Sequence, residues 1–131
     1  MIGIDTNVLV RKIIRDDEEQ AARADAFLAS LTTVNPGYVT HIVLVETWWV
    51  LTRVYGKSIH DAAALIDTIL DIATITTQDY DLVTEALDAV TTAGADFADA
   101  MIVAVARRNA CQQIRTFEKG AVRHANMTEV D

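Results

Sequence analysis

The sequence is poor in cysteine, proline and glycine. Its 131 residues include one cysteine, one proline and five glycines. The single Cys111 cannot form an internal disulfide, which is typical of a reducing cytoplasm, and we expect it to be a small buried side chain rather than a nucleophile. The scarcity of proline and glycine argues against a disordered or collagen-like chain.

Positive charge is also scarce. Eleven Lys and Arg against 19 Asp and Glu give a formal net charge of −8, which excludes a general basic surface for duplex nucleic acid. The uncharged stretch 26–45 is interrupted by Asn35, Pro36 and Gly37, which argues against a membrane span. The first residues lack the basic start and cleavage site of a signal peptide, so we expect a cytoplasmic protein.

What the sequence does contain is an alternation of short apolar segments and longer amphipathic ones. The length, with 51% hydrophobic residues, predicts a single domain over residues 1–131. The pattern predicts strands at 2–4, 38–40, 74–76 and 114–117, a weaker one at 127–130, and helices at 18–31, 41–55, 58–72, 80–90 and 97–109. Asp16 or Asp17, Ser58 and Asp79 are expected to cap the helices that follow them, and Asp5-Thr6-Asn7 is interpreted as a polar turn. Short apolar strands separated by helices predict an α/β fold with a parallel sheet covered on both faces.

Several acidic residues occupy positions where this fold predicts strand ends or buried helix faces. Asp5 and Glu118 directly follow the first and fourth strands, and Glu46 interrupts an apolar helix face. Asp96 fits a helix N-cap, whereas Asp99 is directed inward by its apolar neighbours. Each has a structural alternative: a turn residue for Asp5, a capping residue for Asp99, a solvent contact or cation pair for Glu46, and an exposed loop for Glu118.

The predicted topology brings these acids toward one edge of the sheet. Asp5 and Glu118 end strands, while Asp99 and Glu46 lie near the first turns of helices that begin above that edge. Carboxylates 4 Å apart repel by roughly 4 kcal/mol at an effective dielectric of 20, so a cation is needed between them. Because there is no Cys or His cluster, the expected ion is Mg²⁺ or Mn²⁺ rather than Zn²⁺.

In order and spacing, these segments resemble the PIN-domain family, and within it the VapC-type ribonuclease toxins of prokaryotic toxin–antitoxin pairs. The segments that carry the resemblance are Asp5-Thr6-Asn7-Val8-Leu9, Glu46 in VLVETWWVL, Asp96-Phe97-Ala98-Asp99-Ala100 and Thr116-Phe117-Glu118-Lys119. The resemblance covers nearly the whole chain. It implies a three-layer α/β/α sandwich with a short, mostly parallel sheet of four to five strands.

The resemblance also implies roles for individual residues. The core ligands of Mg²⁺ or Mn²⁺ would be Asp5, Glu46 and Asp99, with Asp96 as an auxiliary acid and Glu118 as the fourth member of the site. Supporting residues would be Thr6 or Asn7, and Thr116. The family usually has Asp where this chain has Glu118, whose longer side chain would either displace the carboxylate or act through water.

The implied activity is hydrolysis of RNA phosphodiester bonds by metal-activated water, leaving a 5′-phosphate and a 3′-hydroxyl. The implied partners are an RNA substrate, a second copy of the chain in a homodimer, and a cognate VapB-like antitoxin. Trp48 and Trp49 point in different directions on one helix, so one of them is a candidate for an interface.

An RNA substrate requires local positive charge. No Lys or Arg occurs from 58 to 106, a stretch that holds nine acids. The remaining cations cluster, and we expect a basic rim beside the acids, formed by Arg11, Lys12, Arg15, Lys119 and Arg123. The alternative is that these residues form ordinary solvated faces.

Other functions stay open at this point. Glu118 is the argument for a catalytically weak or inactive PIN-like binding module, and Lys119 is the argument for a receiver-like phospho-signalling domain. A haloacid-dehalogenase-type phosphatase needs a second Asp where this chain has Asn7. Cleavage through the 2′-hydroxyl of RNA would instead use histidines, of which the chain has His41, His60 and His124.

Overall fold

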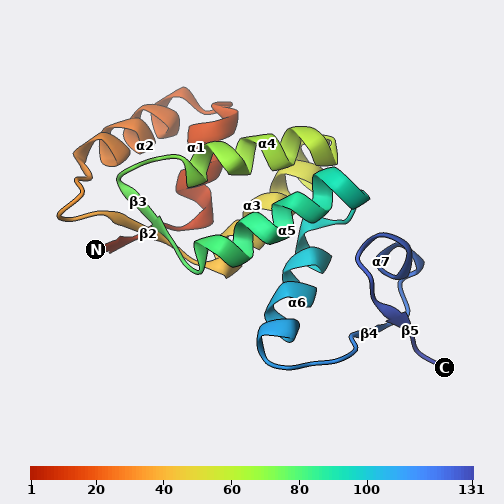
Figure 1. The fold of residues 1–131 in the computed structure, drawn as a ribbon. Coiled ribbons are helices and arrows are strands. Elements are labelled where there is room, and N and C mark those ends of the chain that lie inside the picture. Colours follow the sequence, from red (N-terminus) through yellow and green to blue (C-terminus); the bar gives the residue numbers. More distant parts are fainter.

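The computed structural model describes residues 1–131 and has an α/β architecture (Figure 1). The strands are β1 Ile2–Gly3, β2 Gly37–Val39, β3 Ile75–Thr77, β4 Arg115–Thr116 and β5 Thr128–Glu129. The helices are α1 Thr6–Ile14, α2 Glu18–Ser30, α3 His41–Trp49 with a π-helical continuation η1 Val50–Val54, α4 Ile59–Leu70, α5 Tyr80–Ala93, α6 Phe97–Arg108 and α7 Lys119–His124. The predicted α/β class and all five predicted strand positions are confirmed.

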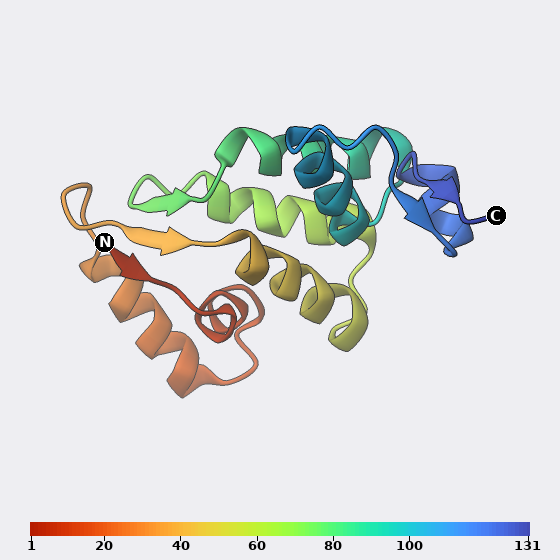
Figure 2. The ribbon, with the colours of Figure 1, turned by 90° about the horizontal axis from the view of Figure 1, so that it is seen from below.

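The strands pair in parallel throughout, but they are divided between two sheets. One sheet has the order β1-β2-β3, with Ile2 opposite Gly37 and Gly37 opposite Ile75, and the other consists of β4 and β5. Figures 1 and 2 both show β4 and β5 at the opposite end of the molecule from the three-stranded sheet. The five strands therefore do not form one continuous sheet, because β4 pairs with β5 and not with β1.

The helices make most of the core. In Figure 2, α1 and α2 gather beside β1, α4 and α5 lie toward β3, and α3 runs between these groups. Fully buried side chains from both groups meet in one hydrophobic cluster that includes Leu9, Leu44, Trp48, Ile66 and Val83. Burial of such side chains stabilises the fold by about 1.5–3 kcal/mol each. None of the helices has the length and hydropathy that crossing a bilayer requires.

Gly37 shows why a residue without a side chain stands at the centre of the first sheet. A Cβ atom at this position would lie 2.5 Å from Cδ1 of Ile4 and 2.9 Å from Cδ1 of Leu31. Both neighbours belong to the buried core, so neither can move without opening a gap. Glycine therefore permits the close approach of β2 to the Ile4 segment.

Helix boundaries follow the predicted capping residues with one exception. The side chains of Asp17, Ser58 and Asp96 accept hydrogen bonds from the first turns of α2, α4 and α6, as expected. Asp79 also precedes its helix, but its backbone is left-handed (φ 46°) and its side chain caps nothing. The prediction that Asp79 caps α5 is therefore wrong.

Two short helices were not predicted. The residues after Asp5 were interpreted as a polar turn, whereas α1 begins at once with Thr6 and buries Leu9 and Val10. α7 follows Glu118 and buries Ala121. Both helices are short and start directly at a strand end, so tertiary packing rather than a long periodic pattern defines them.

Two single-residue expectations have different outcomes. Cys111 is exposed, so the prediction of a buried side chain is wrong; it lies in the segment between α6 and β4, outside the core. The two tryptophans differ as expected from their angular offset: Trp48 is 1% exposed and Trp49 is 54% exposed.

Candidate active site

The start of α6 carries two of the candidate acids, Asp96 and Asp99. Asp96 is the N-cap, and its Oδ1 accepts a hydrogen bond from the backbone N–H of Asp99 at 3.1 Å. Its other oxygen, Oδ2, accepts a hydrogen bond from Nε1 of buried Trp48 at 3.0 Å. The two bonds fix the orientation of Asp96 and link α6 to α3, and the Trp48 ring also packs against Phe97 at a centroid distance of 5.5 Å.

Asp99, in the first turn of α6, lies in an unfavourable electrostatic environment. Its pKa is raised above the usual value because burial disfavours the charged carboxylate and because Asp96 and Glu118 repel it. No Lys or Arg forms an ion pair with any of these three acids. Asp96, Asp99 and Glu118 therefore form an uncompensated acidic group, which we call the α6–α7 acidic group.

Glu118 reaches this group from the C-terminal sheet. It stands between β4 and α7, as the sequence predicts, and its side chain is exposed. Its backbone N–H donates to Oγ1 of Thr116 at 3.0 Å, so Thr116 shapes the turn that carries Glu118. The expected support of Glu118 by Thr116 thus takes the form of a local backbone contact.

Two further acids flank Thr6, Asp5 as its neighbour in sequence and Glu46 through a hydrogen bond, and we call them the Asp5 and Glu46 pair. Asp5 is exposed and occupies the N-cap position of α1 without a side-chain hydrogen bond. Buried Thr6 donates from Oγ1 to Oε1 of Glu46 at 3.2 Å, across a separation of 40 residues. Thr6 therefore holds Glu46 beside the start of α1.

The surroundings of Glu46 differ from the sequence expectation. Its helix face was expected to be apolar and buried, but Glu46 is exposed and its neighbours Ile42 and Trp49 are 73% and 54% exposed. This face of α3 lines an open apolar cleft of about 490 Å³ shared with Ile102 and Val105 of α6. Glu46 thus stands in an apolar surface rather than in the core.

The acids are arranged as these two groups and not as one compact cluster. Nowhere in the chain do three or more His, Cys, Asp or Glu side chains lie close enough together to hold a metal ion. The expectation that Asp5 and Glu118 end strands of one sheet is wrong, because β1 and β4 belong to separate sheets. The assignment of Asp5, Glu46, Asp96, Asp99 and Glu118 as metal ligands stays a prediction.

The chemistry of the donors fits a hard divalent cation. Carboxylate oxygens suit Mg²⁺ and Mn²⁺, and Mg²⁺ is commonly held by only one or two protein carboxylates, water and substrate phosphates. The pKa of Asp99 is raised by its burial and, to a smaller extent, by repulsion from Asp96 and Glu118, and a nearby cation would favour the charged carboxylate. The α6–α7 acidic group and the Asp5 and Glu46 pair are therefore suitable donors.

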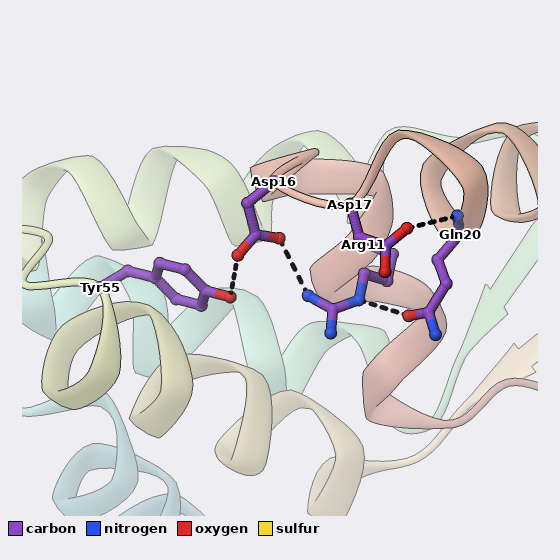
Figure 3. Close-up of polar contacts among 5 residues, drawn as sticks. All are labelled: Arg11, Asp16, Asp17, Gln20 and Tyr55. Atoms are coloured by element: carbon purple, nitrogen blue, oxygen red, sulfur yellow. Dashed lines mark hydrogen bonds and ion pairs between the residues drawn. The ribbon is translucent and has the colours of Figure 1, made fainter.

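The expected basic rim is largely neutralised. Lys12 and Arg15 both bind Asp25, with the closest nitrogen to oxygen distances at 3.1 and 2.7 Å. Arg11 binds Asp16 at 2.9 Å through Nη1 and Gln20 at 2.6 Å through Nε (Figure 3). Lys119 and Arg123 are exposed on α7. The N-terminal half of the predicted rim is thus an internal ion-pair network instead of a free cationic surface.

The histidines are dispersed. His41 lines the cleft between α3 and α6, while His60 and His124 line two further, separate clefts. His41 lies 3.4 Å from Asp79, and Nδ1 of His124 lies 3.0 Å from the carbonyl oxygen of Ala93. This placement does not support a paired-histidine mechanism.

Sequence reasoning missed two contacts that shape the site. The bond from Trp48 to Asp96 joins residues 48 positions apart, and the bond from Thr6 to Glu46 spans 40. Neither contact has a local sequence signal. The general rule that a buried Trp N–H needs a hydrogen-bond acceptor does indicate that Trp48 would have a polar partner, but it does not identify that partner as Asp96.

The fold and the acidic groups together define the class of the protein. Short parallel strands alternate with helices, and the candidate carboxylates lie at strand ends, at helix starts and, for Glu46, in the second turn of α3. The family model described as the PIN domain matches residues 2–126. The chain therefore belongs to the PIN-domain family, which confirms the resemblance seen in the sequence.

Among solved structures, the chain is similar to VapC20 of Mycobacterium tuberculosis, which is described as a toxin that cleaves the sarcin-ricin loop. The two chains are 24% identical, the alignment covers 99% of this chain and 98% of VapC20, and the TM-score is 0.46. No curated protein matches the sequence.

Proposed function

We propose that the chain is an endoribonuclease that depends on Mg²⁺ or Mn²⁺ and acts as the toxin of a toxin–antitoxin pair. The observation that carries this proposal is the α6–α7 acidic group, in which Asp99 is partly buried between two like charges and no Lys or Arg compensates them. In a PIN-domain chain, such a group favours a cation and a phosphate substrate over a purely structural role.

The proposed ligands are Asp5, Glu46 and Asp99, with Asp96 and Glu118 assisting. A divalent cation supplies Lewis acidity, which offsets negative charge on a phosphate oxygen and lets water act as the nucleophile near neutral pH. Trp48 holds Asp96 in one orientation, and Thr6 does the same for Glu46. These bonds restrict the carboxylates before substrate arrives, which reduces the reorganisation needed for reaction.

The test measures cleavage of a single-stranded RNA by the purified chain in Mn²⁺, in Mg²⁺ and in excess chelator. We expect cleavage only with the metals, 5′-phosphate product ends, and loss of activity in Asp5→Asn with the fold verified by circular dichroism. Undiminished cleavage in chelator, or cyclic phosphate ends, would contradict the proposal.

The cleft between α3 and α6 supports the proposed protein partner. Its lining is almost entirely apolar, with Ile42 and Ile102 73% and 53% exposed, and Glu46 stands on its wall. An antitoxin segment with apolar side chains and one basic residue would suit this surface. Co-expression with the product of the adjacent upstream reading frame should relieve growth arrest, and Ile102→Asp should abolish that relief.

The proposed homodimer has a separate test. Trp49 is a large side chain on the exposed face of α3, and aromatic side chains of this kind are enriched in interfaces. Light scattering should give twice the chain mass for the wild type and a larger monomer fraction for Trp49→Ser. We also propose the cytoplasm as the location, which fractionation of expressing cells would check.

The separation of the acids into two groups favours a second candidate, a PIN-domain chain that binds partners without catalysis. Titration with Mn²⁺ distinguishes the two functions. A nuclease should bind Mn²⁺ in a manner that Asp5→Asn and Asp99→Asn both weaken, whereas a binding module should show no difference between these variants and the wild type.

A further inference from the structure

A second cleft, between α1 and α2, is not part of the acidic site. It has a volume of about 510 Å³, within the range of small-molecule sites. The residues that matter for its chemistry are Asn7, Val8, Arg11, Gln20, Arg23 and Phe27. No acidic residue lines the cleft, although the chain as a whole carries a net charge of −8.

One side of the cleft carries two guanidinium groups. Arg11 is held in place because its Nε donates to Gln20 and its Nη1 donates to Asp16, which also accepts a bond from the hydroxyl of Tyr55 at 2.8 Å (Figure 3). These bonds leave Nη2 of Arg11 without a partner in the chain. Arg23 is exposed and forms no ion pair.

Arg11 and Arg23 differ from the neighbouring cations Lys12 and Arg15 in having donors that no acid of the chain occupies. Lys12 and Arg15 are occupied by Asp25, so they have little capacity left for an external anion. Arg23 and the free end of Arg11 are the cationic groups of α1 and α2 that stay available, and both line the same cleft. A guanidinium is well suited to a phosphate because its planar donors match the phosphate oxygens.

The other side of the cleft is apolar. Phe27 and Val8 are partly buried and pack against the main core, which holds them in place. An aromatic face beside guanidinium groups is the combination used to stack a base while its phosphate is bound. The side-chain amides of Gln20 and Asn7 add polar groups for the base or ribose.

The cleft adjoins the candidate site. Asn7 lines the cleft, and its neighbour in sequence, Thr6, donates to Glu46. The start of α1 therefore connects the two: Thr6 contacts Glu46 of the acidic pair, and Asn7, Val8 and Arg11 form a wall of the cleft. A strand of RNA bound at the acids can place an adjacent nucleotide here.

We propose that the α1–α2 cleft binds one nucleotide of single-stranded RNA next to the bond that is cut. The phosphate lies between Arg23 and the free nitrogen of Arg11, and the base packs on Phe27. This inference rests on the proposed nuclease function, and it assigns to Arg23 and Phe27 a positioning role in substrate binding.

The experiment measures binding of a fluorescein-labelled single-stranded RNA oligonucleotide by anisotropy in excess EDTA, where metal-dependent cleavage does not occur. Arg23→Gln should weaken binding roughly tenfold and lower the slope of log K against log salt by about 0.7, as expected for one lost phosphate contact. Phe27→Leu keeps an apolar side chain but loses the aromatic face, and it should weaken binding roughly fivefold with an unchanged slope.

The matched control is Arg108→Gln, the same substitution at an exposed position at the end of α6, far from α1 and α2 (Figure 1). It should bind RNA like the wild type except for a small nonspecific loss. Equal effects of Arg23→Gln and Arg108→Gln would overturn the proposal, because they would reflect net charge alone. Wild-type affinity in Phe27→Leu, with an unchanged melting temperature, would also overturn it.

Two further measurements separate this inference from the nuclease proposal. Asp99→Asn should strongly lower cleavage with Mn²⁺ yet retain RNA binding in EDTA, so a loss of its binding would contradict the assignment of binding to the α1–α2 cleft. If wild type binds RNA as described but never cleaves it with Mn²⁺, the nuclease proposal fails while the cleft is upheld. Displacement of the RNA by a polyglutamate peptide as readily as by a dinucleotide would overturn the cleft's nucleotide specificity.

Discussion

Two charged regions of this molecule are organised in opposite ways. At the α1–α2 end, Lys12 and Arg15 are paired with Asp25. At the start of α6, Asp99 is surrounded by the like charges of Asp96 and Glu118, with no ion pair to compensate them. Opposite charges attract in one region, and like charges are held together in the other.

The two aspartates show the consequence most directly. The hydrogen bonds from Arg15 and Lys12 lower the pKa of Asp25 to about 2, whereas burial and repulsion raise the pKa of Asp99. Charge at Asp25 therefore favours the folded state, and charge at Asp99 opposes it. In this protein the ion pairs of Asp25 stabilise the folded state, whereas the α6–α7 acidic group destabilises it. Binding sites often contain groups that lower stability in this way.

The largest effect is expected at Asp99. Asp99→Asn should lower RNA cleavage roughly 100-fold, because the proposed metal site loses one of its three core ligands. The same substitution should raise the melting temperature at pH 7, because it removes a charge that the folded state disfavours.

The pH dependence checks the cause of that stabilisation. Because the pKa of Asp99 is raised in the folded state, the wild type loses stability as pH rises from the ordinary value of 3.8 through the raised value. The melting temperatures of wild type and Asp99→Asn should therefore converge at pH 3 and separate toward pH 7. Asp67→Asn makes the same substitution at an exposed position on α4. It is the control for the Asp99→Asn cleavage assay and should leave RNA cleavage unchanged.

The next effect concerns the bond that orients the acidic group. Trp48→Phe removes the donor to Asp96 and leaves a gap beside Phe97, and it should lower the free energy of unfolding by about 2 kcal/mol. Urea denaturation measures this change. Trp49→Phe, on the exposed face of the same helix, should change it by less than about 0.5 kcal/mol; equal losses in both variants would mean that the Asp96 bond contributes nothing.

A smaller effect is expected in the paired region. Tyr55→Phe removes the hydroxyl that donates to Asp16 and should lower the free energy of unfolding by about 0.5 kcal/mol, since the bond is exposed to solvent. Tyr80 is 48% exposed and its hydroxyl has no hydrogen-bond partner, so Tyr80→Phe is the matched control. If Tyr55→Phe is as stable as Tyr80→Phe, the hydrogen bond from Tyr55 to Asp16 contributes nothing to the free energy of unfolding.

The smallest effect on stability is expected at Asp25, because exposed ion pairs contribute little. The charge of Asp25 stabilises the fold above its ordinary pKa, and that contribution disappears as pH falls toward about 2. Asp25→Asn should therefore be slightly less stable than wild type at pH 7 and equal to it near pH 2. It should also steepen the salt dependence of RNA binding, because Lys12 and Arg15 become free; Glu19→Gln is the control for charge alone.

Much of the fold was predictable because its signals are local. Asn35-Pro36-Gly37 marks the turn before β2, and the caps Asp17, Ser58 and Asp96 mark helix starts through bonds to residues three positions away. The short helix α1 was not predictable in this way, because a strand end followed by polar residues equally suits a turn.

The candidate acids could be selected from the sequence, but their surroundings could not. Glu46 was expected on a buried face because its helical neighbours are apolar, yet Ile42 lines an open cleft and Trp49 is exposed. Periodicity says which residues share a helix face, and it does not say whether another element covers that face.

The amino-acid order alone determined the parallel α/β class, the family, and the candidate acids at positions 5, 46, 96, 99 and 118, since these depend on short-range patterns and spacing. Tertiary structure alone decided that Arg11, Lys12 and Arg15 are bound internally while Arg23 is free. It also decided that β4 pairs with β5, and that Asp99 lies among like charges. These outcomes depend on contacts between residues far apart in sequence, and the free energy of such contacts exists only once the chain has folded.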